Sequence, residues 1–318
     1  MKYDRKSAKS YSRETMRGIW AAANTPFRAD GSIDENGFQR NMETWITDLS
    51  IDGFFIAGKQ GEFFSMSVEE RKRLFDLSVE ACDGRAQTIM SCSDQNLDVV
   101  IDLAKHAQAC GADYIVVHAP VLNFFKAQDE TLLRYYETIA AKVDIGMALW
   151  SHPDSGYLMS PELCNRLADI ETVVAIKYSV PRDMYKELTR LASDRILVST
   201  ASEEEWLENV LELGWQLYLC SSPPYTYQTK NDRRMREYTD LAFAGEAGRA
   251  RSVSESLQNV RNAFRNSRPA EKPHAHQKYW QELLGQVGGP VRAPLLELND
   301  AEKRIIREAF ESCDLAKS

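Results

Sequence analysis

Thr172-Val173-Val174-Ala175-Ile176-Lys177 is an unbroken run of β-branched and apolar residues that closes on a lysine. β-Branched residues favour strands over helices. Apolar side chains at consecutive positions are typical of strands buried on both faces, as in parallel sheets covered by helices. The run therefore predicts an inner parallel strand of an α/β protein, with the amine of Lys177 at its C-terminal end.

Seven further runs of this kind alternate with amphipathic helical patterns. The eight expected strands are 18–25, 52–57, 86–91, 113–118, 145–150, 172–177, 195–199 and 215–220. The helices expected between them are 35–49, 68–82, 95–109, 128–142, 160–168, 182–192 and 202–213. The strands recur about every 20 to 35 residues, which is the rhythm of parallel strands joined by crossover helices. This alternation predicts an α/β fold, a closed TIM (β/α)8 barrel, for which the 318 residues suffice.

The last third of the chain changes to helical patterns alone. They cover 233–246, 248–265, 274–286 and 299–313, with breaks at Arg268-Pro269 and Gly288-Gly289-Pro290. We therefore expect barrel strands and helices over 17–230, then the final barrel helix and a C-terminal helical extension over 231–318. Residues 1–16 are expected to form an N-terminal arm that is mobile or faces another subunit.

Composition narrows the class of protein. The 39 basic and 47 acidic side chains give a formal charge of −8 without a basic block, so we expect no nucleic-acid partner. The six cysteines form no CxxC pair, which indicates a reducing, cytoplasmic compartment and no metal site. No run approaches the 18 or more apolar residues of a membrane span, so we expect no membrane partner.

Reacting groups of TIM barrels lie at the C-terminal ends of the strands. The segments to inspect are Thr25-Pro26, Gly58-Lys59-Gln60-Gly61-Glu62, Ser91-Cys92-Ser93, His118-Ala119-Pro120, Trp150-Ser151-His152-Pro153, Lys177-Tyr178-Ser179, Ser199-Thr200 and Cys220-Ser221-Ser222. Lys177 stands out because desolvation disfavours an ammonium, and a neutral amine attacks carbonyls to form an imine. Position alone leaves open a lysine that extends into solvent.

The chain resembles the superfamily of dihydrodipicolinate synthase and N-acetylneuraminate lyase, which are Schiff-base class I aldolases. The resemblance covers Gly18 to about Leu315. It rests on the order of these motifs: Asn24-Thr25-Pro26-Phe27, Asp30-Gly31-Ser32-Ile33-Asp34, Gly58-x-x-Gly61-Glu62, Ala109-Cys110-Gly111-Ala112-Asp113, Ala119-Pro120, Trp150-Ser151-His152-Pro153, Ala175-Ile176-Lys177, Leu284-Gly285 and Gly289-Pro290-Val291-Arg292-x-Pro294-Leu295. The resemblance implies that Lys177 forms the imine without a further cofactor. It also implies a 2-oxo acid and an aldehyde as small-molecule partners, and a dimer of dimers.

The glycine-flanked turn matches the loop that holds the substrate carboxylate in this family. Close backbone approach needs glycine, and exposed N–H groups bind an anion. Lys59 and Gln60 stand where the family often carries hydroxyl groups, so we predict that Lys59, Gln60 and Gly61 bind the carboxylate. Lys59 could instead lower the pKa of Lys177 by charge repulsion, or be an exposed loop lysine. The run 61–65 resembles the keto-sugar-acid dehydratase branch.

Trp150 departs from the family pattern, because it stands where the family carries the tyrosine of its Tyr-Asn-x-Pro signature. A phenol relays protons, whereas an indole N–H only donates a hydrogen bond. Val121 and Leu122 stand where the family carries an aromatic pair. The synthase branch also has an arginine that binds a second carboxylate of the substrate, and this arginine has no counterpart here. Lysine biosynthesis is therefore not the expected role.

Other polar groups at the strand ends are candidates for the missing acid or base. His118 and His152 could shuttle protons, although either could be a structural histidine. We count Trp150, Ser151 and His152 with Lys177 as catalytic candidates. Thr200, Tyr218 and His118 join the carboxylate loop as substrate-binding candidates. Tyr178 should point away from Lys177 by strand alternation.

The expected mouth of the barrel is apolar. Its apolar side chains are Trp150, Val121, Leu122, Phe63, Phe64, Phe124 and Phe125. They favour a bulky or aromatic substrate, as in the aromatic hydratase-aldolase branch, or else a subunit interface. The leading hypothesis is a lyase: an aldolase, hydratase-aldolase or dehydratase that acts on pyruvate or a longer 2-oxo acid. The alternatives are a non-catalytic 2-oxo-acid sensor or accessory protein and an imine-based deaminase or decarboxylase.

Overall fold

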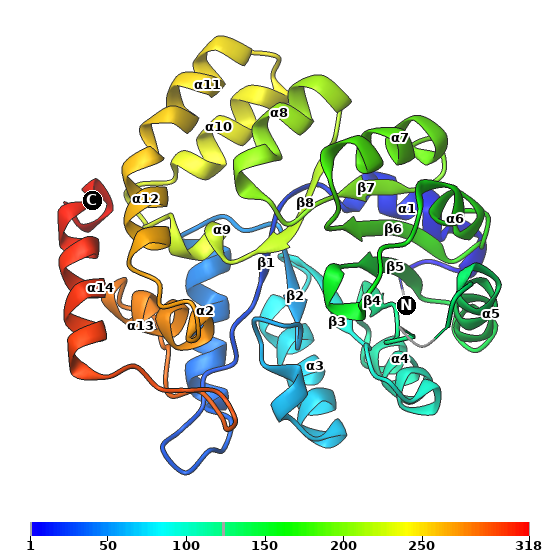
Figure 1. Cartoon of the computed structure of the whole chain (residues 1–318), viewed down its shortest axis with the longest axis horizontal. Coiled ribbons are helices and arrows are strands. Elements are labelled where there is room, and N and C mark those ends of the chain that lie inside the picture. The colour runs from blue at the N-terminus through cyan, green and yellow to red at the C-terminus, as the bar shows by residue number, and fades with distance from the viewer. Residues whose placement is uncertain (1, 123–124, 318) are drawn as a thin grey trace. The chain divides into compact units, whose positions relative to one another are not determined.

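A computed structural model describes residues 2–122 and 125–317, and strands and helices alternate through most of it (Figure 1). Its strands are β1 (Gly18–Ala22), β2 (Gly53–Ile56), β3 (Gln87–Ser91), β4 (Tyr114–His118), β5 (Gly146–Ser151), β6 (Val173–Tyr178), β7 (Leu197–Ser199) and β8 (Leu217–Ser221). The helices between them are α2 (Glu35–Thr47), α3 (Val68–Cys82), α4 (Leu97–Cys110), α5 (Asp129–Ala140), α6 (Pro161–Leu167), α7 (Arg182–Ala192) and α8 (Glu203–Leu213). Each expected strand and helix of the alternation is present, with bounds that differ by a few residues.

The strands follow the order β7-β6-β5-β4-β3-β2-β1-β8 in an eight-stranded sheet. Neighbours in this order are also neighbours along the chain, and β1 and β8 are adjacent. The pairs β1–β2, β3–β4, β4–β5, β5–β6 and β6–β7 are all parallel. This is the topology of a (β/α)8 barrel, so the expected fold class is confirmed.

The chain divides into two compact units. The first unit holds residues 2–18 and 87–220, and the second unit holds residues 19–86 and 221–317. In the first unit, β4, β5 and β6 lie side by side with α5, α6 and α7 outside them (Figure 1). All six residues of β5 and all six of β6 are buried. The unbroken apolar run that ends at Lys177 is thus explained, because both faces of its strand are covered.

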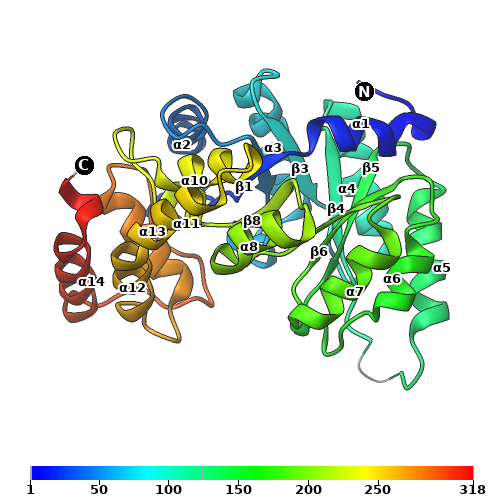
Figure 2. The ribbon, with the colours of Figure 1, turned by 90° about the horizontal axis from the view of Figure 1, so that it is seen from above.

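The N-terminal segment packs on the first unit. Helix α1 (Ala8–Thr15) contacts β5 and β6 (Figure 2). The hydroxyl of Tyr3 donates to the backbone oxygen of Asp113 and accepts from the N–H of Gly146 at 2.8 Å. One side chain thereby satisfies backbone groups at the starts of two neighbouring strands. Whether the segment also faces another subunit stays a prediction.

The second unit joins β1, β2, α2 and α3 to the C-terminal helices. These are α9 (Pro223–Thr226), α10 (Arg234–Phe243), α11 (Ala247–Ser256), α12 (Gln258–Asn266), α13 (Pro273–Leu283) and α14 (Asp300–Ser312). The helix expected over 248–265 is two helices that meet at Leu257, and the short α9 was not expected. Helices α12 and α13 both pack against α14. The expected helical appendage is confirmed, and no described helix has the length and apolarity to cross a membrane.

We predict that Tyr3→Phe lowers the free energy of unfolding by about 1 to 3 kcal/mol, because Asp113 O and Gly146 N–H lose their partner. Urea denaturation followed by circular dichroism measures the change. Lys6→Ala, at an exposed position of the same segment, is the control and should leave the midpoint unchanged. Equal midpoints for Tyr3→Phe and the wild type would show that these two hydrogen bonds contribute nothing to stability.

Candidate active site

Lys177 is a buried amine near the C-terminal end of β6. Its residue is 3% exposed, and its Nζ donates to the backbone oxygen of Cys220 at 2.9 Å. The same Nζ lies 4.9 Å from the centre of the Trp150 ring. Trp150 is the register partner of Lys177 on β5, which explains why the two side chains meet. The amine is therefore surrounded by an aromatic face and a carbonyl dipole rather than by bulk water.

Strand alternation separates Ser151 and Tyr178 from this amine. The two residues are register partners, one position beyond Trp150 and Lys177. The hydroxyl of Tyr178 donates to the backbone oxygen of Met159 at 2.6 Å, and Ser151 Oγ accepts from the N–H of Met159 at 3.0 Å. Both hydroxyls thus face the segment before α6. Tyr178 points away from Lys177 as expected, and the structure does not bring Ser151 together with Lys177.

Two histidines gather around Trp150. His118 pairs with Trp150 in register, and the two rings meet edge to face with centres 4.7 Å apart. The ring of His152 lies 6.4 Å from Trp150 and 6.5 Å from His118. The structure therefore brings together Lys177, Trp150, His118 and His152, from three neighbouring strands and their ends. Lys177 and these three rings are called the lysine cluster below.

The two histidines differ in their surroundings. Burial lowers the pKa of His118 to about 4, with a further lowering from His152 and Lys177, so its imidazole is neutral at pH 7. His152 lies at the more open edge, where its Nδ1 accepts the N–H of Asp154 at 3.2 Å. That bond fixes the orientation of the ring and leaves Nε2 as its other polar atom.

Thr200 and Tyr218 have different relations to this cluster. Ser199 is the register partner of Lys177 on β7, so Thr200 follows at the same strand end, where it is buried. The hydroxyl of Tyr218 donates to the backbone oxygen of Ala201 at 2.9 Å, and its ring packs 5.8 Å from that of Trp206 in α8. These contacts of Tyr218 hold a loop and a helix on the strands.

The segment after β4 supplies exposed apolar side chains. Val121 is 40% exposed and Phe125 is 46% exposed. The side chain of Gln95 holds this segment, because its amide donates to Val121 O and accepts from Val121 N–H. The backbone of Val121 is thus held just after the strand that carries His118. Phe124, also expected here, lies outside the described residues.

The glycine-flanked turn after β2 belongs to the second unit. Glu62 adopts a left-handed backbone with φ 58°. A Cβ at Gly61 would lie 3.0 Å from the backbone oxygen of Ala23, a tight approach that favours glycine at this position. Thr25 Oγ1 donates to Gly61 O at 2.8 Å. The motif between Gly58 and Glu62 therefore encodes a specific backbone shape, as the sequence indicated.

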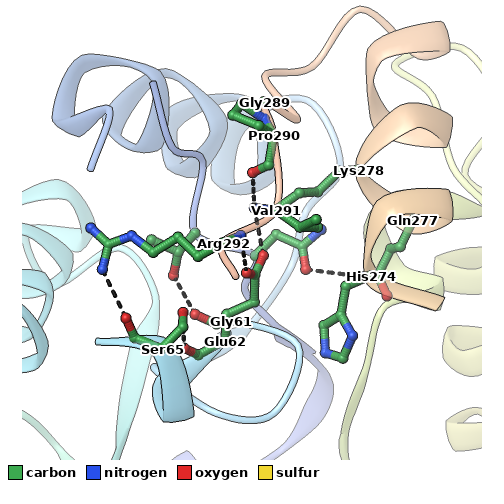
Figure 3. Close-up of polar contacts among 12 residues, drawn as sticks. Gly61, Glu62, Ser65, His274, Gln277, Lys278, Gly289, Pro290, Val291 and Arg292 are labelled. Carbon is green, nitrogen blue, oxygen red and sulfur yellow. Dashed lines mark hydrogen bonds and ion pairs between the residues drawn. The ribbon is translucent and has the colours of Figure 1, made fainter. Parts of the chain in front are cut away.

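Glu62 forms a fully buried ion pair with Lys278 of α13 (Figure 3). The Oε1 to Nζ distance is 2.6 Å, and the two side chains are 0% and 1% exposed. The other carboxylate oxygen, Oε2, accepts the N–H of Arg292 at 3.0 Å, and Lys278 donates to Pro290 O at 2.8 Å. Burial lowers the pKa of Lys278, an effect that the Glu62 carboxylate opposes.

A chain of buried amides lies beneath β1 in the same unit. Gln277 donates to Asn24 Oδ1 at 2.8 Å and to the hydroxyl of Tyr225. Tyr225 in turn donates to Ala22 O at 2.7 Å, and Asn24 donates to Gln281. Sequence reasoning missed these partners and Lys278. One feature of the sequence could have indicated them: helix α13 carries polar side chains on every face, so some must be buried. In the structure Gln277, Lys278 and Gln281 are buried.

The eight-stranded topology defines a (β/α)8 barrel, with a buried lysine at the end of β6. The sequence profile described as the Dihydrodipicolinate synthetase family matches residues 15–312. The chain therefore belongs to this family, among lyase and aldolase enzymes.

Individual relatives are distant. The 4-hydroxy-tetrahydrodipicolinate synthase of Methanothrix thermoacetophila is 26% identical over 298 residues, which are 93% of this chain and 96% of that enzyme. The N-acetylneuraminate lyase of Clostridium perfringens is 29% identical over 193 residues, 60% of this chain and 66% of that one. The structure of YagE from E. coli K12, in complex with pyruvate, matches with a TM-score of 0.83 at 22% identity. It covers 94% of this chain and 99% of that one. YagE shares the fold.

We predict that stability falls as the pH drops from about 6.5 toward 4. Burial lowers the pKa of His118 to about 4 and of His276 to about 3, so the unfolded chain, with ordinary histidines, binds more protons across this range. By pH 5 each histidine should cost about 2 kcal/mol of unfolding free energy relative to pH 7.5. Urea denaturation at the two pH values measures this. His118→Gln should remove its share, and an unchanged pH slope in this variant would contradict the assignment.

Proposed function

We propose that this protein is a Schiff-base lyase that acts on pyruvate or a longer 2-oxo acid through Lys177. The observation that carries the proposal is the placement of Nζ: buried at the end of β6, 2.9 Å from Cys220 O and over the Trp150 ring. A lysine that merely extends into solvent would leave its amine exposed. Membership of the family, on whose imine-forming lysine Lys177 falls, supports the same role.

The chemistry follows from this environment. The neutral amine attacks the C2 carbonyl of the 2-oxo acid, and loss of water gives a protonated imine. In a 4-hydroxy-2-oxo acid, a base takes the proton of the C4 hydroxyl, and the C3–C4 bond breaks as its electron pair moves into the imine. The aldehyde leaves, and the resulting enamine takes up a proton at C3. Hydrolysis then returns the 2-oxo acid and the free amine. Cys220 O is placed to keep its hydrogen bond with the nitrogen of the protonated imine, which orients the intermediate.

We assign the proton transfers to the histidines of the lysine cluster. His118 and His152 flank Trp150, which stands where a tyrosine was expected, and an indole cannot exchange a proton in this step. A neutral His118 is able to accept a proton, and His152, nearer to solvent, is able to pass it on. Thr200 at the end of β7 is the candidate for positioning water or the aldehyde oxygen.

The carboxylate of the 2-oxo acid is assigned to the turn that holds Lys59, Gln60 and Gly61. Within the described residues, no backbone hydrogen bond engages the N–H groups of Gln60 and Gly61. Two successive N–H groups of this kind are the usual backbone receptor for an anion. The proposal needs no cofactor beyond the covalent imine. We also assign the protein to the cytoplasm and propose that it is a homotetramer, which its mass in solution would test.

A bulky or aromatic aldehyde suits the apolar side chains of the first unit. Trp150 supplies a ring face beside the amine, and Val121 and Phe125 add apolar surface after β4. A sugar-acid substrate would instead call for hydroxyl-binding groups at these positions. We therefore favour cleavage or hydration of an arylidene-type 2-oxo acid over the sugar-acid reactions.

Trp150 also supports a second candidate, because an indole cannot relay the proton that turnover requires. This candidate is a 2-oxo-acid sensor that forms the imine without turnover. An imine-based deaminase or decarboxylase is the third. Ligand-dependent stabilisation without product would identify the sensor, and release of ammonia or carbon dioxide would identify the third.

We predict that sodium borohydride with pyruvate attaches the reduced three-carbon adduct to Lys177, because borohydride reduces the imine to a stable amine. Peptide mass spectrometry locates the adduct. Lys177→Arg should abolish both trapping and turnover, while Lys186→Arg, at a surface lysine of α7, should change neither. An unmodified Lys177 across a panel of 2-oxo acids would refute the proposal.

We also predict that Trp150→Ala lowers kcat/KM about fivefold for aromatic aldehydes in the condensation direction and much less for short aliphatic ones. The reason is the loss of about 1 kcal/mol of ring contact that only an aromatic acceptor makes. Steady-state rates with paired aldehydes measure the ratio. An equal loss for both classes would show that Trp150 acts on the imine and not on the acceptor.

A further inference from the structure

We propose that Lys278 of α13 is a positioning residue for the carboxylate-binding turn, acting through the buried carboxylate of Glu62. The inference rests on the proposed function of that turn and adds what holds it in shape. Every contact that carries it lies within the second unit (Figure 3).

The backbone of the turn depends on external support. Glu62 has a left-handed conformation, φ 58° and ψ 39°, which is unfavourable for a residue with a side chain. Such a conformation persists where its surroundings over-determine it. The Glu62 carboxylate provides this restraint, because Oε1 lies 2.6 Å from Lys278 Nζ and Oε2 accepts the N–H of Arg292.

Lys278 connects the carboxylate to the C-terminal segment. Its Nζ also donates to Pro290 O at 2.8 Å and lies 4.4 Å from the ring centre of Phe27. A Cβ at Gly289 would lie 2.4 Å from Phe27 O, so the chain passes too closely here for any other residue. The glycine-proline motif thus delivers Pro290 O to the ammonium and Arg292 N–H to the carboxylate.

Two further groups fix the carbonyls of the turn. His274, on the first turn of α13, donates from Nε2 to Lys59 O at 2.9 Å. Arg292 donates to Ser65 O at 3.0 Å while its guanidinium pairs with Glu70. Because a trans peptide directs its N–H opposite to its C=O, the bond to Lys59 O also sets the direction of the Gln60 N–H. The same helix therefore restrains both ends of the proposed anion receptor.

The alternative is that the ion pair only stabilises the fold. A purely structural pair would change unfolding when removed but would leave the affinity of the folded protein for a carboxylate intact. A positioning pair would weaken that affinity while leaving the imine chemistry of Lys177 unchanged at saturation. The two roles therefore separate in the concentration dependence of imine formation.

The test compares three variants of the full chain. Glu62→Gln/Lys278→Met removes both charges, so neither is left buried alone, and it is the decisive variant. Lys278→Met leaves the Glu62 carboxylate without its cation and is expected to fold poorly. Lys272→Met is the matched control, because it removes an ion pair with Glu302 at the start of the same helix without touching the turn.

Two measurements are made on each folded variant. Borohydride trapping of Lys177 over a range of pyruvate concentrations gives a half-saturating concentration and a maximum extent. Amide hydrogen exchange of peptides that cover 58–65 reports the order of the turn. We expect the double variant to raise the half-saturating concentration about ten- to a hundredfold, with the same maximum and faster exchange over 58–65. Lys272→Met should match the wild type in both.

Each outcome decides the matter. An unchanged half-saturating concentration in the double variant overturns the inference, even if its stability falls. If the wild type itself traps no 2-oxo acid, the proposed function fails. In that case hydrogen exchange of the double variant still tests the Glu62–Lys278 pair. Unchanged exchange over 58–65 overturns its positioning role, and faster exchange confined to this turn supports it.

Discussion

The burial of β6 on both faces is the constraint on which the rest of the first unit depends. A strand covered by neighbouring strands and helices has no place for a charged side chain along its length, so its lysine stands near the end. At that position the amine meets a carbonyl and an indole face instead of water. The same burial that stabilises the fold keeps this amine out of bulk water, which is the environment that the proposed attack on a carbonyl would use.

In the second unit, the main structural requirement is the support of the irregular turn after β2. A parallel strand ends in a loop whose backbone groups have no partners of their own, and the proposed carboxylate site also requires N–H groups in this turn that can donate to a ligand. Helix α13 and the glycine-proline segment satisfy the remaining groups with a buried ion pair and side-chain bonds to carbonyls. A buried ion pair contributes little net stability, because desolvation offsets the attraction, but it fixes geometry. This is the property that a receptor for a small anion requires.

The lysine cluster places an indole where the family resemblance leads us to expect a phenol. With Trp150 in register beside Lys177, the aromatic ring contributes contact surface instead of a transferable proton. Beside Lys177, the neighbouring histidines His118 and His152 are the titratable side chains whose rings lie 4.7 and 6.4 Å from that ring. His118 is the more buried of the two, and burial lowers its pKa, which suits the proposed relay from a dry site toward solvent.

The sequence by itself determined the strand and helix alternation, the (β/α)8 class and the place of Lys177. Hydrophobic periodicity and the position of a residue at a strand end can be recognised within a short stretch of sequence. Strand alternation also correctly turned Tyr178 away. The tertiary structure decided that Ser151 faces Met159, that the N-terminal segment is packed, and that Glu62 pairs with Lys278 across 216 positions of sequence. Such contacts depend on how segments that are distant in sequence meet in space, so the residue spacing within one segment cannot predict them.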